Sequence, residues 1–362
     1  MRLKAIISSL VAFVAIDYGI SAQPKALYQA DTVSICIMGD MMMHSAQIAD
    51  ALQKDGTYDF STYFTYIEER IKAADIAIAN MEFTLGGEPY SGYPAFSAPD
   101  SYASYLAGCG FDIFLAANNH IFDKSGAGAE RTLSIYRDLG RKYGIQVCGL
   151  AEDAVTRERT TPLKVLAKGM RIGIVNFTYG TNSGTDLHWP KTNYMNERTF
   201  IRKALERAQD CDLTLVLPHW GTEYELLHSP AQEVLAGELA ENGADIIIGS
   251  HPHVPQDFKT IGDVPVAYSL GNGVSNMSAP NTQLELMAEI KLVRELSGDT
   301  KLLPVRFTYL WCSRPGGLCS SYTVIPVKDF IGKRNLWQGA WDYDKMMSTY
   351  ERVRNIIGIE DN

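Results

Sequence analysis

The chain has 362 residues, and its 42 Asp and Glu against 33 Lys and Arg give a formal net charge of −9. Its 46% hydrophobic and 21% charged residues are typical of a globular protein and exclude extensive disorder. The acidic balance, with no long stripe of Lys and Arg, argues against nucleic acid as a partner.

Residues 1–22 have the pattern of an export signal. Arg2 and Lys4 supply positive charge, an apolar run follows over 6–16, and Ser21-Ala22 supplies small residues before a polar segment. The run is about half the roughly 20 residues that span a bilayer. A buried first helix or a retained anchor is the alternative. We expect a cleaved signal and a protein in the periplasm, the cell envelope or the extracellular space.

Five short apolar runs along the chain are each closed by polar residues. The runs start near residues 33, 75, 112, 212 and 245. Their closing residues are Gly39-Asp40, Asn80-Met81-Glu82, Asn118-Asn119-His120, His219-Trp220-Gly221 and His251-Pro252-His253. Continuous, β-rich runs of this length are typical of strands buried on both faces.

The stretches between these runs have helical spacing. In 130–143, Leu133, Tyr136 and Leu139 recur at intervals of three residues before Gly144, and 230–242 has a similar pattern. Alternating strands and helices predict an α/β fold with a largely parallel sheet. The carboxyl ends of such strands share one edge, so we expect the closing residues to converge there.

After residue 255 the pattern changes to strand-like segments with few helices between them. These segments are 264–270, 284–293, 302–311 and 322–327, and they predict a second, more antiparallel sheet packed on the first. The tail from 337 ends in an amphipathic helix. We therefore expect one domain over 31–327 and a C-terminal extension over 328–362.

Six cysteines are present, and an exported protein meets an oxidising environment. Cys312 and Cys319 bracket a turn-rich loop between two strand-like segments, which suits a disulfide across a hairpin. Cys36, Cys148 and Cys211 lie in or beside apolar runs, so we interpret them as small buried hydrophobic residues.

The closing residues combine carboxylate, amide and imidazole groups. These suit Mn, Fe, Zn or Mg rather than copper–thiolate or iron–sulfur chemistry. In extended geometry the side chains of His251 and His253 would point the same way and reach one metal cluster. Two ions about 3.5–4 Å apart would form a clamp for phosphoryl displacement. Histidines that only make hydrogen bonds are the alternative, and we assign that role to His188 and His228.

Six ordered motifs over about 33–275 together resemble the CapA-type capsule synthesis family, the poly-gamma-glutamate capsule family, which is related to calcineurin-like metallophosphoesterases. The motifs are Gly39-Asp40, Asn80-x-Glu82, Asn118-Asn119-His120-x-x-Asp123, His219-Trp220-Gly221-x-Glu223-Tyr224, Gly249-Ser250-His251-Pro252-His253 and Tyr268-Ser269-Leu270-Gly271-Asn272. The chain departs from the broader phosphoesterase pattern at His44, four residues after Asp40 rather than two, and at Glu82 and Ile121.

The resemblance implies an α/β fold built as a two-sheet αββα sandwich of the metallophosphoesterase type, with two divalent metal ions. It implies Asp40 on the first ion, Glu82 as the bridging carboxylate and Asn119 as the amide ligand. His219 and His251 would bind the second ion, and His253 the first. His120 would act near the leaving group as general acid or charge stabiliser, oriented by Asp123. Further candidates are His44, Asn80, Asn118, Glu223 and Asn272.

Two hypotheses follow. The first is an exported, metal-dependent, phosphoesterase-like hydrolase in capsule or cell-envelope polymer biosynthesis. The alternative is a non-catalytic scaffold that binds or exports an anionic polymer beside a membrane synthase complex. An acidic protein repels polyglutamate over long range, so either role needs a local positive centre. Bound metals, with Arg131 or Arg171 near the groove, would supply one.

Overall fold

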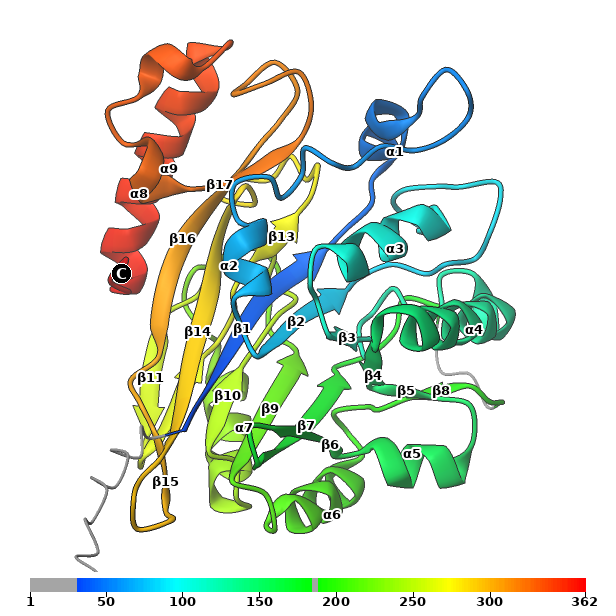
Figure 1. Ribbon diagram of the computed structural model, residues 1–362, viewed down its shortest axis with the longest axis vertical. Coiled ribbons are helices and arrows are strands. Elements are labelled where there is room, and N and C mark those ends of the chain that lie inside the picture. The colour runs from blue at the N-terminus through cyan, green and yellow to red at the C-terminus, as the bar shows by residue number, and fades with distance from the viewer. Residues whose placement is uncertain (1–30, 184–187) are drawn as a thin grey trace, which may run out of the picture.

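The computed structural model describes residues 31–183 and 188–362, so the expected signal at 1–22 lies outside the described residues. Two β-sheets face each other, and helices cover their outer surfaces (Figure 1). This is the two-sheet αββα sandwich that the family resemblance implies, and the predicted fold class is confirmed.

The first sheet has nine strands in the order β17-β16-β14-β1-β2-β3-β4, with β13 paired to β1 and β15 paired to β14. Its strands are β1 Thr32–Met41, β2 Ile76–Met81, β3 Ile113–Leu115, β4 Gln146–Cys148, β13 Asn272–Val274, β14 Leu284–Arg294, β15 Thr300–Leu302, β16 Arg306–Ser313 and β17 Thr323–Pro326. Strands β1 to β4 run parallel, whereas β14 pairs antiparallel with β1.

The second sheet has six strands in the order β11-β12-β10-β9-β7-β6. They are β6 Leu163–Ala167, β7 Met170–Thr178, β9 Leu213–His219, β10 Ile246–Ile248, β11 Phe258–Ile261 and β12 Val264–Ala267. The central strands β7, β9, β10 and β12 are parallel. A separate ladder joins β5 (Leu150–Ala151) to β8 (Lys191–Thr192).

Side-chain alternation along the strands explains the layers. In β1, Ile35 and Ile37 belong to the core between the sheets, whereas Cys36 and Met38 face the outer helices. Both faces of the strand are therefore apolar, which is why its sequence is a continuous hydrophobic run rather than an alternating one.

Helices on the two outer faces complete the sandwich (Figure 1). On the side of the first sheet lie α1 Ser45–Ala51, α2 Glu68–Lys72, α3 Asp100–Gly108 and α4 Ser125–Tyr143. On the side of the second sheet lie α6 Arg198–Ala208 and α7 Pro230–Glu241. The remaining helices are α5 Ala154–Thr160, α8 Val327–Phe330 and α9 Ala340–Ile357, with a 3₁₀ turn at Arg334–Leu336.

The C-terminal helix α9 packs on the inner face of the first sheet, beside β14 and β16 (Figure 1). Met346 and Val353 on the helix are fully buried in the same core as the strands. Asp342 anchors its first turn by accepting hydrogen bonds from Ser313 Oγ (2.6 Å) and Trp311 Nε1 (3.3 Å). The helix therefore covers the part of the inner face beside these strands, and the domain division at residue 327 stays a prediction.

The expectation that the strands after residue 255 form a separate sheet is wrong. Strands β14, β16 and β17 join the first sheet beside β1, whereas β11 and β12 extend the second. As a result, the five runs that we expected on one edge divide between two sheets. Which strand occupies a free sheet edge depends on contacts distant in sequence, and local hydrophobic patterns do not encode them.

The predicted disulfide between Cys312 and Cys319 is also wrong, since all six cysteines lie in the described part of the chain and are free thiols. The Cys312 thiol points to the carbonyl of Ser275 (3.7 Å), and that of Cys319 points to the carbonyl of Ser321 (3.2 Å). The two sulfur atoms thus have different partners. Across residues 31–183 and 188–362, no helix combines the length and the apolar character needed to cross a membrane.

Candidate metal centre

Asp40 lies near the end of β1, where the pairing with β2 shifts register between Met38 and Asp40. The preceding Gly39 allows a close backbone approach, because a Cβ atom there would lie 1.9 Å from the carbonyl oxygen of Gly271. Asp40 is fully buried and accepts hydrogen bonds from Asn80 Nδ2 (2.7 Å) and the His251 N–H (3.1 Å). The strand irregularity therefore fixes this carboxylate at the sheet edge.

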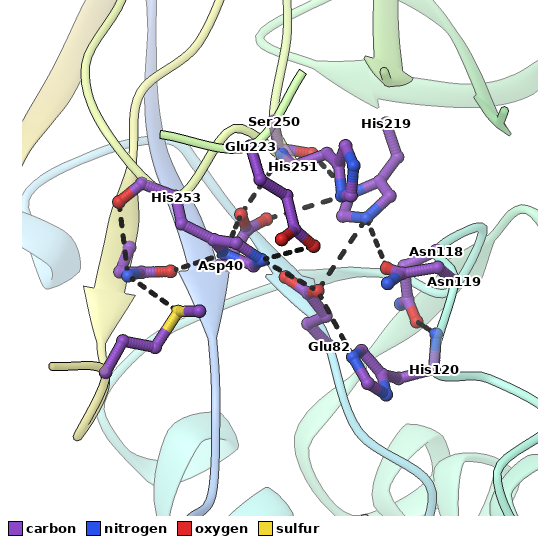
Figure 2. Close-up of polar contacts among 12 residues, drawn as sticks. Asp40, Glu82, Asn118, Asn119, His120, His219, Glu223, Ser250, His251 and His253 are labelled. Carbon is purple, nitrogen blue, oxygen red and sulfur yellow. Dashed lines mark hydrogen bonds and ion pairs between the residues drawn. The ribbon is translucent and has the colours of Figure 1, made fainter. Parts of the chain in front are cut away.

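Glu82 follows β2, and its fully buried carboxylate lies at the centre of the cluster (Figure 2). Its Oε1 lies 3.8 Å from Nε2 of both His219 and His253, and 3.9 Å from Nε2 of His120. Neither carboxylate oxygen has a hydrogen-bond partner among the described residues. A buried carboxylate without donors is costly unless a cation occupies the space beside it.

His219 closes β9 and reaches the first sheet from the second (Figure 2). Its Nε2 lies 2.7 Å from Oδ1 of Asn119, and its Nδ1 lies 3.0 Å from Ser250 Oγ and 3.8 Å from Asp40 Oδ1. Residues from both sheets thus meet at one end of the sandwich. The predicted convergence of the strand-closing residues is correct in space, although two sheets rather than one supply them.

The segment that carries His251 and His253 is not extended, contrary to our expectation. Both residues have positive φ angles, 99° and 60°, which non-glycine residues rarely adopt. His253 Nδ1 lies 2.9 Å from Oδ1 of Asn272, an acceptor, so Nδ1 carries the proton and Nε2 is free toward Glu82. The Nδ1 atom of His251 is buried and has no partner in the described chain.

The donor atoms fall into two groups that share one carboxylate. Glu82, His251 and His253 form one group, and Asp40, Glu82 and His219 form the other, with ligand atoms within 4.8 Å of one another in each. Glu82 and His251, which carry buried polar atoms without a partner in the described chain, both belong to these groups. The residues therefore fit divalent cations. This grouping pairs His219 with Asp40, and the division of ligands between two ions stays a prediction.

The pKa shifts agree with a site made for positive charge. Burial, reinforced by the charge of Asp40, raises the pKa of Glu82 well above its usual value. Burial opposes ionisation of Asp40 too, but the neighbouring His253 and His219 and the hydrogen bond from Asn80 hold its pKa below the usual value. Burial lowers the pKa of His219 to about 3 and that of His251 well below normal. Neutral imidazole is the form that binds a metal.

His120 lies beside the cluster, in a defined orientation. Its Nδ1 lies 2.6 Å from Oδ2 of Asp123, its backbone N–H donates to Asn118, and its ring contacts Phe96 edge-on at 4.6 Å. Asp123 is itself held by the Phe96 N–H at 2.7 Å. The carboxylate therefore binds the Nδ1–H tautomer, and Nε2 is directed toward Glu82.

The additional candidates have different positions. Asn80 bridges Asp40 and His219, and Asn272 fixes His253. Asn118 donates to the Met81 carbonyl (2.9 Å) and to Asn80 Oδ1 (3.4 Å), so it supports both the loop and the Asn80 side chain. Glu223 is half exposed and lies 3.9 Å from His253. His44 precedes α1, where its backbone N–H donates to Gln47 Oε1, and it lies outside both donor groups. His228 pairs with Asp257, as its assigned hydrogen-bonding role requires.

Our reading of the sequence missed two residues of this site. The ring of Tyr179 lies 4.4 Å from that of His251, and Asn182 Nδ2 lies 3.4 Å from both ring nitrogens of His120. Both follow β7, whose apolar run is also closed by polar residues, so the rule that identified the other strand ends could have found them. Arg131 and Arg171 instead pair with Asp100 and Asp210.

Comparison with known proteins connects the chain to capsule synthesis. A family model described as "Bacterial capsule synthesis protein PGA_cap" matches residues 34–277. The capsule biosynthesis protein CapA of Bacillus anthracis is 26% identical over 309 residues, covering 80% of this chain and 72% of that protein. The PGA biosynthesis protein CapA of Bacillus subtilis (strain 168) is 24% identical over 299 residues, covering 79% and 75%.

Two solved structures are also similar to the chain. A 5'-nucleotidase precursor from Thermus thermophilus has a TM-score of 0.47 at 12% identity, covering 90% of this chain and 59% of the nucleotidase. The NAD nucleotidase of Haemophilus influenzae has a TM-score of 0.47 at 12% identity, covering 91% and 68%. TM-scores at this level are too low to bear on the function of this chain.

Proposed function

The chain belongs to the bacterial capsule synthesis protein family, and we propose that it is an exported, metal-dependent hydrolase of the phosphoesterase type. It acts in the biosynthesis of a capsule or cell-envelope polymer of the poly-gamma-glutamate kind. The observation that supports this most is the fully buried Glu82 carboxylate, which has no donor among the described residues and is shared by two groups of ligand atoms.

The proposed ligands are Asp40, Glu82, Asn119, His219, His251 and His253. Divalent cations bound there, Mn, Fe, Zn or Mg, would polarise a phosphoryl oxygen and favour deprotonation of an attacking water. The buried surroundings keep bulk water from screening these charges. Neutral His219 and His251 already have the protonation state that ligands need, so binding costs no proton release from them.

His120 is the proposed general acid. Nδ1 is held by Asp123, so Nε2 is the atom that delivers a proton to the departing oxygen of the ester. Asp123 keeps the ring in one tautomer and stabilises the protonated form. The side chain of Asn182 flanks the ring and limits its movement. In this arrangement, water adds to phosphorus, the ester P–O bond breaks, and the leaving group takes the proton from His120.

The remaining parts of the proposal concern place and partners. Export to the periplasm, the cell envelope or the extracellular space rests on the signal pattern at residues 1–22. The two Bacillus relatives are named as capsule and PGA biosynthesis proteins. Their names support the proposal that this chain acts beside a membrane synthase complex that handles an anionic polymer. A non-catalytic scaffold in the same complex is the alternative role.

Metal content and ester turnover test the proposal. Protein purified from metal-replete cells should hold about two divalent ions per chain and hydrolyse generic phosphomonoesters or phosphodiesters. Asp40→Asn should lose both properties, whereas Asp112→Asn, at the opposite end of the parallel strands, should keep them. Wild-type protein without transition metal, and with activity that Asp40→Asn leaves unchanged, would contradict the proposal. Metal-independent polymer binding without turnover would favour the scaffold.

A further inference from the structure

A cavity of about 430 Å³ opens directly beside the candidate metal centre. His120 and His253 line it on the side of the metal centre. A group bound in the cavity could therefore be the part of a substrate that is attached to a phosphate held at the metal centre. The general acid proposed above borders the same space. The position is therefore that of the leaving group of a phosphoester, and the inference rests on the proposed function.

No Lys or Arg side chain is among the described residues that line the cavity, and its one carboxylate is Glu223, 3.9 Å from His253. The guanidinium of Arg314 lies behind the wall, where it donates to the carbonyl of Met277. Arg131 and Arg171, the two arginines considered as sources of local positive charge, are paired with Asp100 and Asp210 instead. A leaving group with a carboxylate would meet repulsion from Glu223 and from the chain as a whole, whose net charge is −9.

Two exposed tyrosines line the same cavity. Tyr93 is 72% exposed and Tyr224 is 40% exposed. Tyr224 has a φ of 69°, fixed by a 2.8 Å hydrogen bond from its N–H to the Pro252 carbonyl, and its ring lies 6.2 Å from that of His253. Strain in a non-glycine residue costs on the order of 1–3 kcal/mol and is concentrated at functional sites.

Methionines add an adaptable apolar surface. Met42 and Met277 also line the cavity, and thioether side chains adjust to the shape of flat, apolar groups. Tyrosine faces stack well on aromatic rings and on the apolar faces of sugar rings. Because no Lys or Arg side chain lines the cavity and Glu223 does, this lining favours an uncharged ring over a polyanionic chain.

We propose that this cavity binds the uncharged, ring-shaped leaving group of a phosphoester, stacked on Tyr224 and Tyr93, and discriminates against leaving groups that carry a carboxylate. Water supplies the oxygen that joins phosphorus, the bond from phosphorus to the ring-bearing oxygen breaks, and His120 returns a proton to that oxygen. The polyglutamate chain itself is therefore not the leaving group at this site.

Binding of non-hydrolysable phosphonates to the metal-loaded, full-length mature protein tests the inference without requiring turnover. Calorimetry should show phenylphosphonate binding about 5–10 times more tightly than methylphosphonate, which lacks the ring. 4-Carboxyphenylphosphonate should lose most of this advantage, and Glu223→Gln should restore part of it. A pyranosylmethyl phosphonate distinguishes a sugar ring from an aromatic one.

Variants identify the stacking residues. Tyr224→Ala and Tyr93→Ala should each remove most of the preference for phenyl over methyl, measured as the ratio of the two affinities. Tyr143→Ala, at a tyrosine that is also 40% exposed but lies at the end of α4, should leave this ratio unchanged. Tyr224→Phe should retain the preference, because it keeps the stacking face.

Equal affinity for the phenyl and methyl compounds, tighter binding of the carboxylated compound, or no phosphonate binding at all would overturn the inference. A ring preference in a protein that hydrolyses no ester would contradict the proposed catalysis while supporting the cavity assignment. The two failures are therefore distinguishable.

Discussion

Nδ1 of His120 lies 2.6 Å from Oδ2 of Asp123, and Oδ2 also accepts a hydrogen bond from the Phe96 N–H at 2.7 Å. The second contact fixes the carboxylate, so the imidazole cannot rotate without losing its partner. A histidine held through one nitrogen exposes the other at a defined position, and here that position faces Glu82 and the cavity.

This pair gives the first prediction. His120→Ala should lower kcat for phosphoesters by about 10²–10⁴-fold, with the largest loss for leaving groups of high pKa, which depend most on protonation. Metal content should stay at the wild-type level, because His120 is outside both donor groups. Steady-state kinetics with a series of aryl and alkyl phosphates measures the effect. An equal loss for all leaving groups would argue against a general acid.

A second prediction concerns the cost of the buried Glu82. Its pKa is raised above 4.5 in the folded, metal-free protein. Above pH 4.5 the unfolded chain loses the Glu82 proton while the folded protein keeps it, so the contribution of this group to stability falls as pH rises. Glu82→Gln should therefore stabilise EDTA-treated protein at pH 8 by about 1–3 kcal/mol. The same change should reduce the stabilisation that added divalent metal gives the wild type.

Urea unfolding with EDTA and with metal measures both effects of Glu82→Gln. Glu289→Gln, on β14 away from the cluster, is the matched control and should show neither. If Glu82→Gln instead destabilised the metal-free protein, the Glu82 carboxylate would have compensating partners, and the prediction would be wrong.

Much of the site was predictable from sequence because strand ends in parallel sheets carry the ligands. Asp40, Glu82 and His219 all follow or end buried apolar strands, and the structure brings them together. The helix predicted at 130–143 exists as α4, which begins earlier, at Ser125. The sequence did not indicate this first turn, because Gly126 and Gly128 lack the apolar periodicity that marks a helix.

What the sequence did not predict depends on tertiary contacts. The insertion of β14 beside β1 is a pairing between residues some 250 positions apart, and no local pattern encodes it. The positive φ angles of His251 and His253 occur without the glycine or asparagine that normally indicates them, so extended geometry was the natural expectation. In both places the surrounding structure determines the backbone, and local preference is overridden.

A third prediction tests the close approach of two strands beside Asp40. Gly39→Ala would place a Cβ atom 1.9 Å from the Gly271 carbonyl oxygen, a backbone atom that cannot move alone. We expect a loss of about 2 kcal/mol or more in the free energy of unfolding, together with lower metal content. Gly237→Ala is the control, since that position in α7 has open space and should gain up to about 1 kcal/mol. Similar behaviour of the two variants would contradict the packing.

A fourth prediction follows from the free thiols. Burial raises the pKa of the thiols of Cys36 and Cys148 to about 12 and of Cys109 and Cys312 to about 11, so these four should resist alkylation at pH 7.5. Cys211 and Cys319, which are partly exposed, should react first. Peptide mass spectrometry of protein purified without reductant measures the alkylation of the four buried cysteines and of the two partly exposed ones. A peptide pair linked through Cys312 and Cys319 would show that the disulfide exists after all.

A fifth prediction concerns pH and His44, whose side chain caps α1 and accepts from the Asn276 N–H at 3.3 Å. Burial lowers its pKa from 6.5 to about 4, so between these values the unfolded chain binds a proton that the folded protein does not. Stability contributed by neutral His44 is therefore complete above pH 6.5 and is lost as pH falls toward 4, by at most about 1.4 kcal/mol per pH unit. His44→Asn keeps a capping side chain and removes the titration. Urea unfolding of both EDTA-treated proteins at pH 7.5, 6 and 5 should show the variant gaining on the wild type at each step, and parallel pH dependence would refute the burial of this imidazole.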